Sequence, residues 1–244
     1  LIEECTSTHF RPHMAETLWN PLDMNRTAML TSTVTADQDY ALGISTNVPN
    51  QVGQEVTVNA ESYAASHLWP AMGAWSTAAD LAKFAQFLMH GDNDILSSEW
   101  LNEMTTIQVD SEEGYPEKGN GYGIVVKNGI NFGGEHYPVK MISHTGTIFG
   151  YTSFMYLIPE LDVGVIALVN REQAVPTESI TLALDLPDLV DAVPYEVQIP
   201  TEFADYVGIY NNEYTIGNFI LTETEEGLHV SVPAFDNASM TYEP

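Results

Sequence analysis

The downstream half of the chain alternates short apolar runs with turn residues, a pattern typical of an antiparallel sheet. Phe154–Ile158 and Val163–Val169 are apolar runs separated by Pro159–Glu160, and together they predict a hairpin buried in a sheet. The strands predicted beyond Gly121 are Tyr122–Lys127, Val139–Ser143, Tyr151–Ile158 and Val163–Asn170.

The strongest helical periodicity follows Trp75. Ser76 and Thr77 both offer a side-chain oxygen that can cap a helix N-terminus, and Gly91 is the kind of residue that ends a helix. The apolar face of this predicted helix is formed by Ala78, Leu81, Ala82, Phe84, Ala85 and Leu88. Such a stripe indicates a helix that packs on a core.

The upstream third is less regular. Leu1–Trp19 has a helical pattern that Pro12 interrupts, and Thr31–Gln54 is rich in loop residues. The single cysteine, Cys5, excludes a disulfide within the chain and is expected to be a small buried residue of the first helix.

The last part of the chain predicts a small separate module. A helix is expected near Glu178–Leu184, and the proline-bearing segment Val193–Pro200 predicts a linker. Three further strands are predicted at Tyr206–Tyr210, Phe219–Thr222 and Leu228–Val232, with turns at Gly217 and Gly227. The predicted fold class is therefore α/β, an α+β sandwich with an antiparallel sheet flanked by helices and a small C-terminal antiparallel β module.

Composition narrows the classes of function. Of the 244 residues 44% are hydrophobic, which is enough for one sizeable core plus a small module. The 7 Lys and Arg residues against 34 Asp and Glu give a formal net charge of −27, which argues against a nucleic-acid partner. No apolar run approaches the roughly 20 residues that span a bilayer. The acidic surface favours solubility, with adaptation to saline or calcium-rich surroundings as the alternative.

No pattern in the sequence predicts a metal site or a cofactor. His9 and His13 have the i, i+4 spacing of two metal ligands on one helix face, but Pro12 lies between them and no third ligand accompanies them. We therefore expect neither a metal ion nor a cofactor.

A compact polar triplet, His144–Gly146, precedes the predicted hairpin and is the best candidate for chemistry. His144 and Thr145 can donate hydrogen bonds to an anion, and Gly146 lets another group approach the backbone closely. We expect the triplet to form a turn at the leading edge of the hairpin. Taken alone, it is also compatible with an ordinary surface turn.

The segment Ser143–Asn170 resembles the third motif of the serine β-lactamase and penicillin-binding-protein-like superfamily, in its class C and esterase branch, where H-T-G often replaces K-T-G. Four more segments follow the order of that family, namely Pro21–Thr27, Trp69–Gly91, Gly121–Val126 and Tyr206–Tyr214. Together the segments span nearly the whole chain, so the resemblance does not depend on one short motif.

This resemblance implies a domain organisation and a reaction. It also implies that Thr31–Met104 contributes part of an all-helical lobe. Residues 1–192 are expected to form a β-lactamase-like domain that is N-terminally incomplete, residues 193–200 a linker, and residues 201–244 a partial lipocalin-like β module. In such a family a serine attacks a carbonyl group, and the resulting acyl-enzyme is then hydrolysed.

The resemblance also assigns roles to residues of the third motif. His144 would orient the substrate carboxylate or the catalytic proton network, and the backbone N–H of Thr147 would donate a hydrogen bond to the oxyanion. The implied substrate-binding residues are Thr145, Gly146 and Trp75, with Trp69 as an alternative to Trp75.

The nucleophile motif of the family is absent from the chain. In the family, Ser-x-x-Lys and then Tyr-x-Asn precede the segments matched here, and no serine of this chain has a lysine three positions later. Tyr210–Asn212 matches the second motif, but it follows H-T-G and is interpreted as a chance match. Leu1–Trp19 resembles the helix that follows the catalytic tyrosine. We therefore expect the downstream portion of a larger enzyme, inactive by itself.

Two hypotheses of different classes follow. In the first, the chain belongs to a serine hydrolase acting on a small acyl substrate (an ester, a D-amino-acid peptide or a β-lactam), and the missing N-terminal segment of the same precursor, or another chain, completes it. In the second, it is a non-catalytic binding or structural protein in which the acidic surface matters more than a cleft. We expect an extracellular or periplasmic location rather than a cytoplasmic one.

Overall fold

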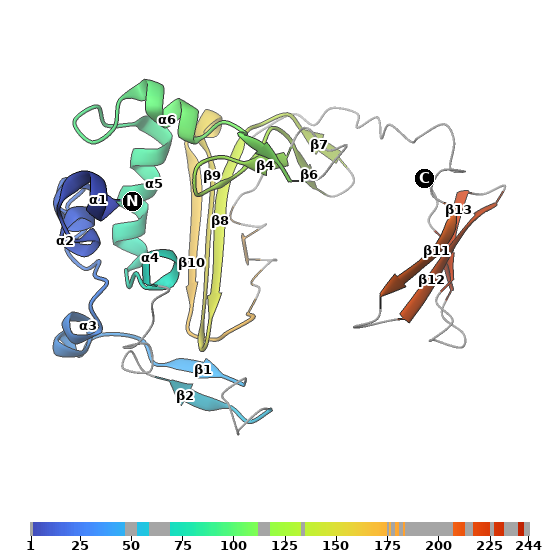
Figure 1. Ribbon diagram of the computed structural model, residues 1–244, viewed down its shortest axis with the longest axis horizontal. Coiled ribbons are helices and arrows are strands. Elements are labelled where there is room, and N and C mark those ends of the chain that lie inside the picture. Colours follow the sequence, from blue (N-terminus) through green and yellow to red (C-terminus); the bar gives the residue numbers. More distant parts are fainter. Residues whose placement is uncertain are drawn as a thin grey trace. The chain divides into compact units, whose positions relative to one another are not determined.

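A computed structural model of the chain describes residues 2–46, 53–58, 69–111, 118–132, 135–174, 176, 179–180, 183, 207–212, 217–224, 227–231 and 239–241. The chain divides into two compact units, Leu1–Pro194 and Tyr195–Pro244 (Figure 1). The interpretation of the first as an N-terminally incomplete domain and of the second as a lipocalin-like module stays a prediction. The predicted linker Val193–Pro200 and most of the predicted helix near Glu178–Leu184 lie outside the described residues.

The first unit is built on a six-stranded antiparallel sheet of order β10-β9-β8-β5-β4-β3. Its strands are β3 Val109–Asp110, β4 Lys118–Asn120, β5 Val125–Lys127, β8 Met141–Ile148, β9 Tyr151–Ile158 and β10 Val163–Val169. The helices are α1 Ile2–Thr6, α2 Phe10–Met14, the π-helix η1 Ala15–Trp19, α3 Thr31–Asp37, α4 Trp69–Met72, α5 Ala78–His90 and α6 Ser98–Met104. This arrangement confirms the predicted α/β class.

The hairpin predicted from the apolar runs is confirmed. β9 and β10 pair antiparallel from Ile158↔Val163 to Thr152↔Val169, and the 3-10 helix η3, Pro159–Leu161, connects them. The prediction of a polar turn at His144–Gly146 is wrong, because these residues lie inside β8 and pair with β9. Turn propensity is a local preference, and the pairing of β8 with β9 overrides it here.

Helix α5 lies against β9 and β10 (Figure 1). Thr77 is its N-cap and accepts a hydrogen bond from the Asp80 N–H, while Gly91 ends it with a φ of 77°. The predicted apolar face is right for Ala85 and Leu88, whereas Ala78 and Ala82 are exposed.

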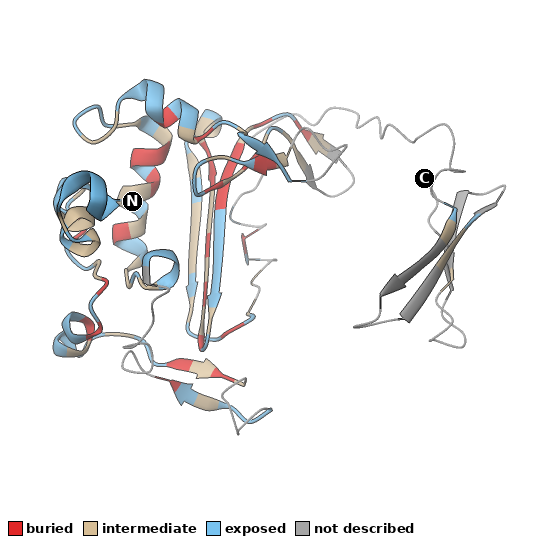
Figure 2. Cartoon of the chain, in the orientation of Figure 1, coloured by how far each residue is buried: buried red, intermediate tan, exposed pale blue. Residues whose placement is uncertain are grey.

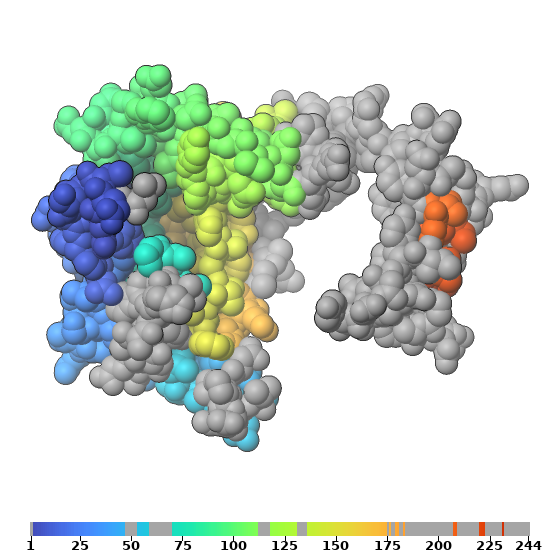
Figure 3. All heavy atoms as spheres, in the orientation of Figure 1, coloured from blue at the N-terminus to red at the C-terminus, as the bar shows by residue number. Residues whose placement is uncertain are grey.

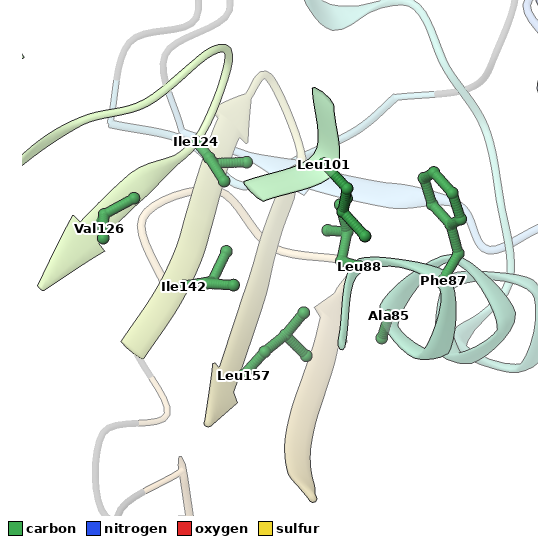
Figure 4. Packing of buried hydrophobic residues seen from close by; sticks show 8 residues of the cluster. All are labelled: Ala85, Phe87, Leu88, Leu101, Ile124, Val126, Ile142 and Leu157. Carbon is green, nitrogen blue, oxygen red and sulfur yellow. The ribbon is translucent and has the colours of Figure 1, made fainter. Parts of the chain in front are cut away.

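One hydrophobic cluster joins this helix to the sheet (Figure 4). Its buried members come from α5, α6, the sheet and the segment before β5: Ala85, Phe87, Leu88, Leu101, Ile124, Val126, Ile142 and Leu157. A second cluster covers the opposite face and consists of Tyr137, Val139, Met141, Phe154, Ile158 and Ile180. Two-sided burial of this kind explains why the central strands read as continuous apolar runs.

Three predictions about the upstream part are wrong. The first helical segment breaks at Ser7, which has a φ of 55°, and not at Pro12, which occupies the first turn of α2 where its missing N–H would have no intrahelical partner. Cys5 is exposed on α1, because none of the residues of that short helix is buried. The expected helical lobe also contains a small hairpin of β1, Gly43–Ser45, and β2, Val56–Val58.

The remaining strands form two smaller sheets. β6, Ile130–Phe132, pairs with β7, Glu135–Tyr137. In the second unit, β11 to β14 form a four-stranded antiparallel sheet in sequence order, with bounds Gly208–Asn212, Gly217–Thr224, Gly227–Ser231 and Ser239–Thr241. Its first three strands overlap the predicted ones, while β14 was not predicted.

Candidate active site

The residues singled out in the sequence lie in the second half of β8. Met141, Ile142 and Ser143 are buried, whereas His144 to Thr147 are exposed, and Figure 2 shows this change along the strand. The yellow atoms of β8 accordingly reach the surface in Figure 3. A central strand that becomes exposed halfway along its length offers its residues to a ligand.

The hydrogen-bonding direction of each residue in β8 follows from the turn that ends it. Phe149 and Gly150 form a two-residue turn, so Ile148 and Tyr151 are the hydrogen-bonded pair that closes the hairpin. Bonded and non-bonded pairs alternate along an antiparallel ladder. The backbone groups of His144 therefore point toward β9, as do those of Gly146.

The backbone groups of Thr145 and Thr147 point to the other edge of β8. On that edge β5 pairs only with Met141–Ser143. Among the described residues, no strand other than β5 pairs with this edge of β8. The backbone N–H of Thr147 is thus directed at an edge that is open in the described part of the chain. This geometry suits a donor that is reserved for a bound group.

The side chain of His144 lies on the face of the sheet that α5 covers. Residues two apart share a face, and Ile142 packs in the cluster that contains Leu88 of α5. The imidazole makes no hydrogen bond or ion pair with any residue that the structure describes. Thr145 lies on the opposite face, so His144 and Thr145 would approach a ligand from different sides of the strand.

Trp75 lies close to the turn end of β8. Its ring is 5.3 Å from that of Tyr151 and 5.9 Å from that of Tyr40, in edge-to-face arrangements. Its backbone pairs with Ala28 through bonds of 2.8 and 3.0 Å. The structure therefore places Trp75 in an aromatic cluster beside the strand of the H-T-G motif, whereas the side chain of Trp69 lies outside the description.

A buried carboxylate that the sequence did not single out connects two of the family-like segments. Asp80, 5% exposed, accepts hydrogen bonds from the Arg26 backbone N–H at 2.7 Å and from the Thr27 hydroxyl at 2.9 Å. The Thr27 and Ser76 hydroxyls are 2.8 Å apart. The one sequence signal that could have identified Asp80 is its position three residues after the N-cap Thr77. That signal does not predict burial, because an acidic residue in the first turn of a helix is ordinarily exposed.

A second buried carboxylate, Glu172, holds the turn between β8 and β9. It accepts hydrogen bonds from the Ser45 hydroxyl at 2.8 Å, from the Thr46 N–H at 2.7 Å and hydroxyl at 3.2 Å, and from the Gly150 N–H at 3.4 Å. Burial alone would raise the pKa of Glu172, but these hydrogen bonds outweigh it and lower the pKa. Glu172 is therefore a carboxylate at neutral pH.

The nearest lysine in sequence to the motif is Lys140. It is half-buried, and its Nζ lies 3.4 Å from the Thr105 hydroxyl at the end of α6. Burial lowers the pKa of Lys140, which the neighbouring Glu160 partly offsets. Its positive charge faces α6 and not the exposed half of β8.

The described residues contain no group of three or more His, Cys, Asp or Glu side chains arranged to hold a metal ion. None of the helices in the described part has the length and apolar character that crossing a bilayer requires.

Comparison with known proteins identifies a family that matches most of the chain. A family model described as Beta-lactamase matches residues 1–186. No curated protein matches the chain.

Solved structures share the fold. The octameric penicillin-binding protein homologue from Pyrococcus abyssi has 23% sequence identity and a TM-score of 0.62, covering 94% of this chain and 49% of that one. A D-stereospecific amidohydrolase from Streptomyces sp. has 22% identity and a TM-score of 0.58, covering 75% and 51%. A penicillin-binding protein from Bacillus halodurans has 18% identity and a TM-score of 0.54, with the same coverage. The chain spans about half the length of these structures.

Proposed function

Because the chain belongs to the beta-lactamase family, within the serine β-lactamase and penicillin-binding-protein superfamily, we propose that the complete protein is a serine hydrolase that works through an acyl-enzyme. Its substrate is a small ester, a D-amino-acid peptide or amide, or a β-lactam. The observation that carries this proposal is the open edge of β8 at Thr147.

Thr147 supplies one oxyanion donor in this mechanism. When a serine attacks a carbonyl group, negative charge develops on the carbonyl oxygen, and a pre-oriented N–H stabilises that charge more than it stabilises the substrate. The N–H of Thr147 is fixed by the β8–β9 ladder and is not used by β5. It therefore needs no reorganisation when the charge forms.

His144 orients the reacting groups from the face that α5 covers. An imidazole can donate to a substrate carboxylate or take part in moving the serine proton. Its freedom from other described partners supports this role. Thr145 and Gly146 line the same stretch of strand. A Cβ at Gly146 would lie 2.9 Å from the Ser153 hydroxyl, so glycine keeps this position clear of a side chain.

The nucleophile comes from residues outside these 244 in this proposal. No Ser-x-x-Lys occurs in the chain, and the chain spans about half the length of the solved structures that it matches. The 244-residue chain is then inactive by itself, and a segment of the same precursor or another chain completes the site.

Labelling by a fluorophosphonate and by a fluorescent penicillin tests the proposal. The chain alone should remain unlabelled, and the chain joined to an upstream segment with Ser-x-x-Lys should be labelled at that serine. In the joined protein, Thr147→Pro should slow acylation by about 10²–10³-fold, because it removes one oxyanion donor without breaking the ladder to β9. His144→Ala should slow it by about 10²-fold or more.

His90→Ala serves as the matched control, because His90 is exposed at the end of α5 and pairs with Asp162 at 3.0 Å. It should acylate at the parent rate. Unchanged acylation in Thr147→Pro would remove the open edge from the mechanism. A joined protein that no acylating probe labels would favour the alternative, a non-catalytic binding or structural protein.

A further inference from the structure

Asp80 is buried, charged and remote in sequence from the H-T-G motif. A carboxylate in the interior is unfavourable unless hydrogen bonds and opposite charge compensate its lost hydration. Compensation is present: Asp80 lies in the first turn of α5, its Oδ1 is 3.7 Å from the Lys83 Nζ, and its Oδ2 accepts the bonds from Arg26 and Thr27. The side chain thus points from α5 to the segment that precedes Ala28.

The contacts of that segment lead to Trp75. Thr27 bonds to Asp80 and also contacts the Ser76 hydroxyl, and the next residue, Ala28, makes both backbone bonds to Trp75. Asp80 and the Thr27–Ser76 contact therefore fix the chain on both sides of the Ala28–Trp75 bridge. These side-chain contacts add to the two backbone bonds of the bridge.

Trp75 in turn contacts the first residue of β9, just after the turn that ends β8. Its ring packs edge to face on Tyr151, and Tyr151 is the hydrogen-bonded partner of Ile148, the neighbour of Thr147. The Tyr151 hydroxyl is also anchored, since it donates to the Ala41 carbonyl oxygen at 2.8 Å. Displacement of Trp75 would remove an aromatic contact from Tyr151, next to the turn that ends β8.

We propose that Asp80 is a positioning residue for the acyl-transfer site, which acts through Thr27, Ala28 and Trp75 on the turn end of β8. This inference rests on the proposed function for its effect on catalysis. Its structural half, the ordering of Trp75 by Asp80, does not.

The first measurement is the near-ultraviolet circular dichroism of the 244-residue chain, which reports the fixed environment of an aromatic side chain. Trp75→Phe defines the contribution of Trp75. Thr27→Val removes the shared hydroxyl with little change in volume, and Asp80→Asn removes the charge. Both should lose at least half of the Trp75 contribution, while Thr33→Val, exposed on α3, should keep all of it.

The second measurement is acyl transfer by the joined protein. Thr27→Val should reduce kcat/KM by about tenfold or more at a temperature where the variant is fully folded, because small displacements of a site are costly. Thr33→Val should match the parent.

The outcomes separate this inference from the proposed function. Full retention of the Trp75 signal in both Thr27→Val and Asp80→Asn would overturn the inference, however far their melting temperatures fall, because Asp80 would then only brace α5. A lost signal with unchanged kcat/KM would overturn its catalytic half. A joined protein without any acyl transfer would overturn the proposed function, while the circular dichroism would still decide whether Asp80 orders Trp75.

Discussion

Two buried carboxylates, Asp80 and Glu172, connect segments far apart in the chain. Each accepts hydrogen bonds from backbone N–H groups and from hydroxyls, and these charge-assisted bonds are shorter and stronger than those between neutral groups. Glu172 also accepts a hydrogen bond from the Gly150 N–H in the turn after β8, and Asp80 bonds Thr27, whose neighbour Ala28 pairs with Trp75. At the scale of single residues, the exposed half of β8 is held by polar contacts as well as by the core.

Glu172 makes the stability of the fold depend on pH. Its folded-state pKa is lowered below the ordinary value of 4.5, so the stabilisation is fully present above that value and is lost as pH falls through the folded-state pKa. Glu172→Gln should lower the free energy of unfolding at pH 7 by about 1–3 kcal/mol, since an amide cannot accept all of these hydrogen bonds. Urea denaturation from pH 7 down to pH 3 checks both statements.

The control for this experiment is Glu55→Gln. Glu55 is exposed and forms an ion pair of 2.6 Å with Arg171, the residue before Glu172. An exposed pair contributes little, so this variant should stay within about 1 kcal/mol of the parent at pH 7 and keep the acid dependence. If Glu172→Gln showed the same acid dependence as the parent, another group would be responsible for it.

At the scale of elements, the β1–β2 hairpin docks on the turn between β8 and β9. Gly150 has a φ of 80°, and a Cβ there would overlap the Val58 side chain and lie 3.0 Å from the Gly43 Cα. The two backbones approach so closely that only glycine fits. In the same turn, the Gly150 N–H donates a hydrogen bond to Glu172.

Gly150→Ala should therefore destabilise the protein by more than backbone strain alone. Gly123→Ala is the matched control, because Gly123 has a φ of 74° and no heavy atom within 4 Å of its Cβ position. We expect Gly150→Ala to cost about 1–3 kcal/mol more than Gly123→Ala in the free energy of unfolding, which is the usual cost of overpacking. Equal losses in chemical denaturation would mean that the hairpin moves away without penalty.

The elements that the sequence predicted correctly are those fixed by neighbours in the chain. The β9–β10 hairpin and helix α5 with its Thr77 cap depend on local periodicity and turn residues. The β1–β2 hairpin escaped prediction because its strands have only three residues each and are stabilised by docking on Gly150. The expected turn at His144 is strand instead, because His144 pairs with Met155 across the β8–β9 hairpin.

For the candidate site, too, the sequence predicted some features and missed others. The motif identified His144 and Thr147 as candidates, but only the register of β8 shows which backbone groups face an open edge. Asp80 and Glu172 escaped because a charged residue is expected at the surface, and only the folded chain brings their hydrogen-bond donors together. The catalytic roles themselves stay predictions.

At the scale of the whole molecule, β10 is an edge strand with an apolar sequence, VGVIALV. Every second residue of β9 directs its backbone N–H and C=O groups away from β8, and these residues pair with Val163, Val165, Ala167 and Val169 of β10. The backbone groups of the residues between them, such as Ile166 and Leu168, therefore face outward. Just beyond the C-terminal end of β10, the backbone of Ile44 lies on this outer side and forms hydrogen bonds with the backbone of Asn170 and Glu172. No described strand pairs with the outer edge of β10 itself.

Such an edge is a template for another strand, whereas the net charge of −27 keeps copies of the chain apart. Salt screens that repulsion, with a Debye length of about 3 Å at 1 M. We expect the 244-residue chain to be monomeric at low salt and to associate at 1 M NaCl. Sedimentation velocity at both salt concentrations measures this.

Leu168→Pro identifies the surface responsible. It removes an outward N–H and leaves the bonds to β9 intact, so the variant should stay folded and remain monomeric at 1 M NaCl. Leu168→Thr keeps the N–H but removes most of the apolar side chain, which is 44% exposed. If Thr prevents association as well as Pro does, side-chain contacts and not strand pairing drive it. Association that persists in both variants would place the contact on another surface, and the outer edge of β10 would then have no role in recruiting a partner strand.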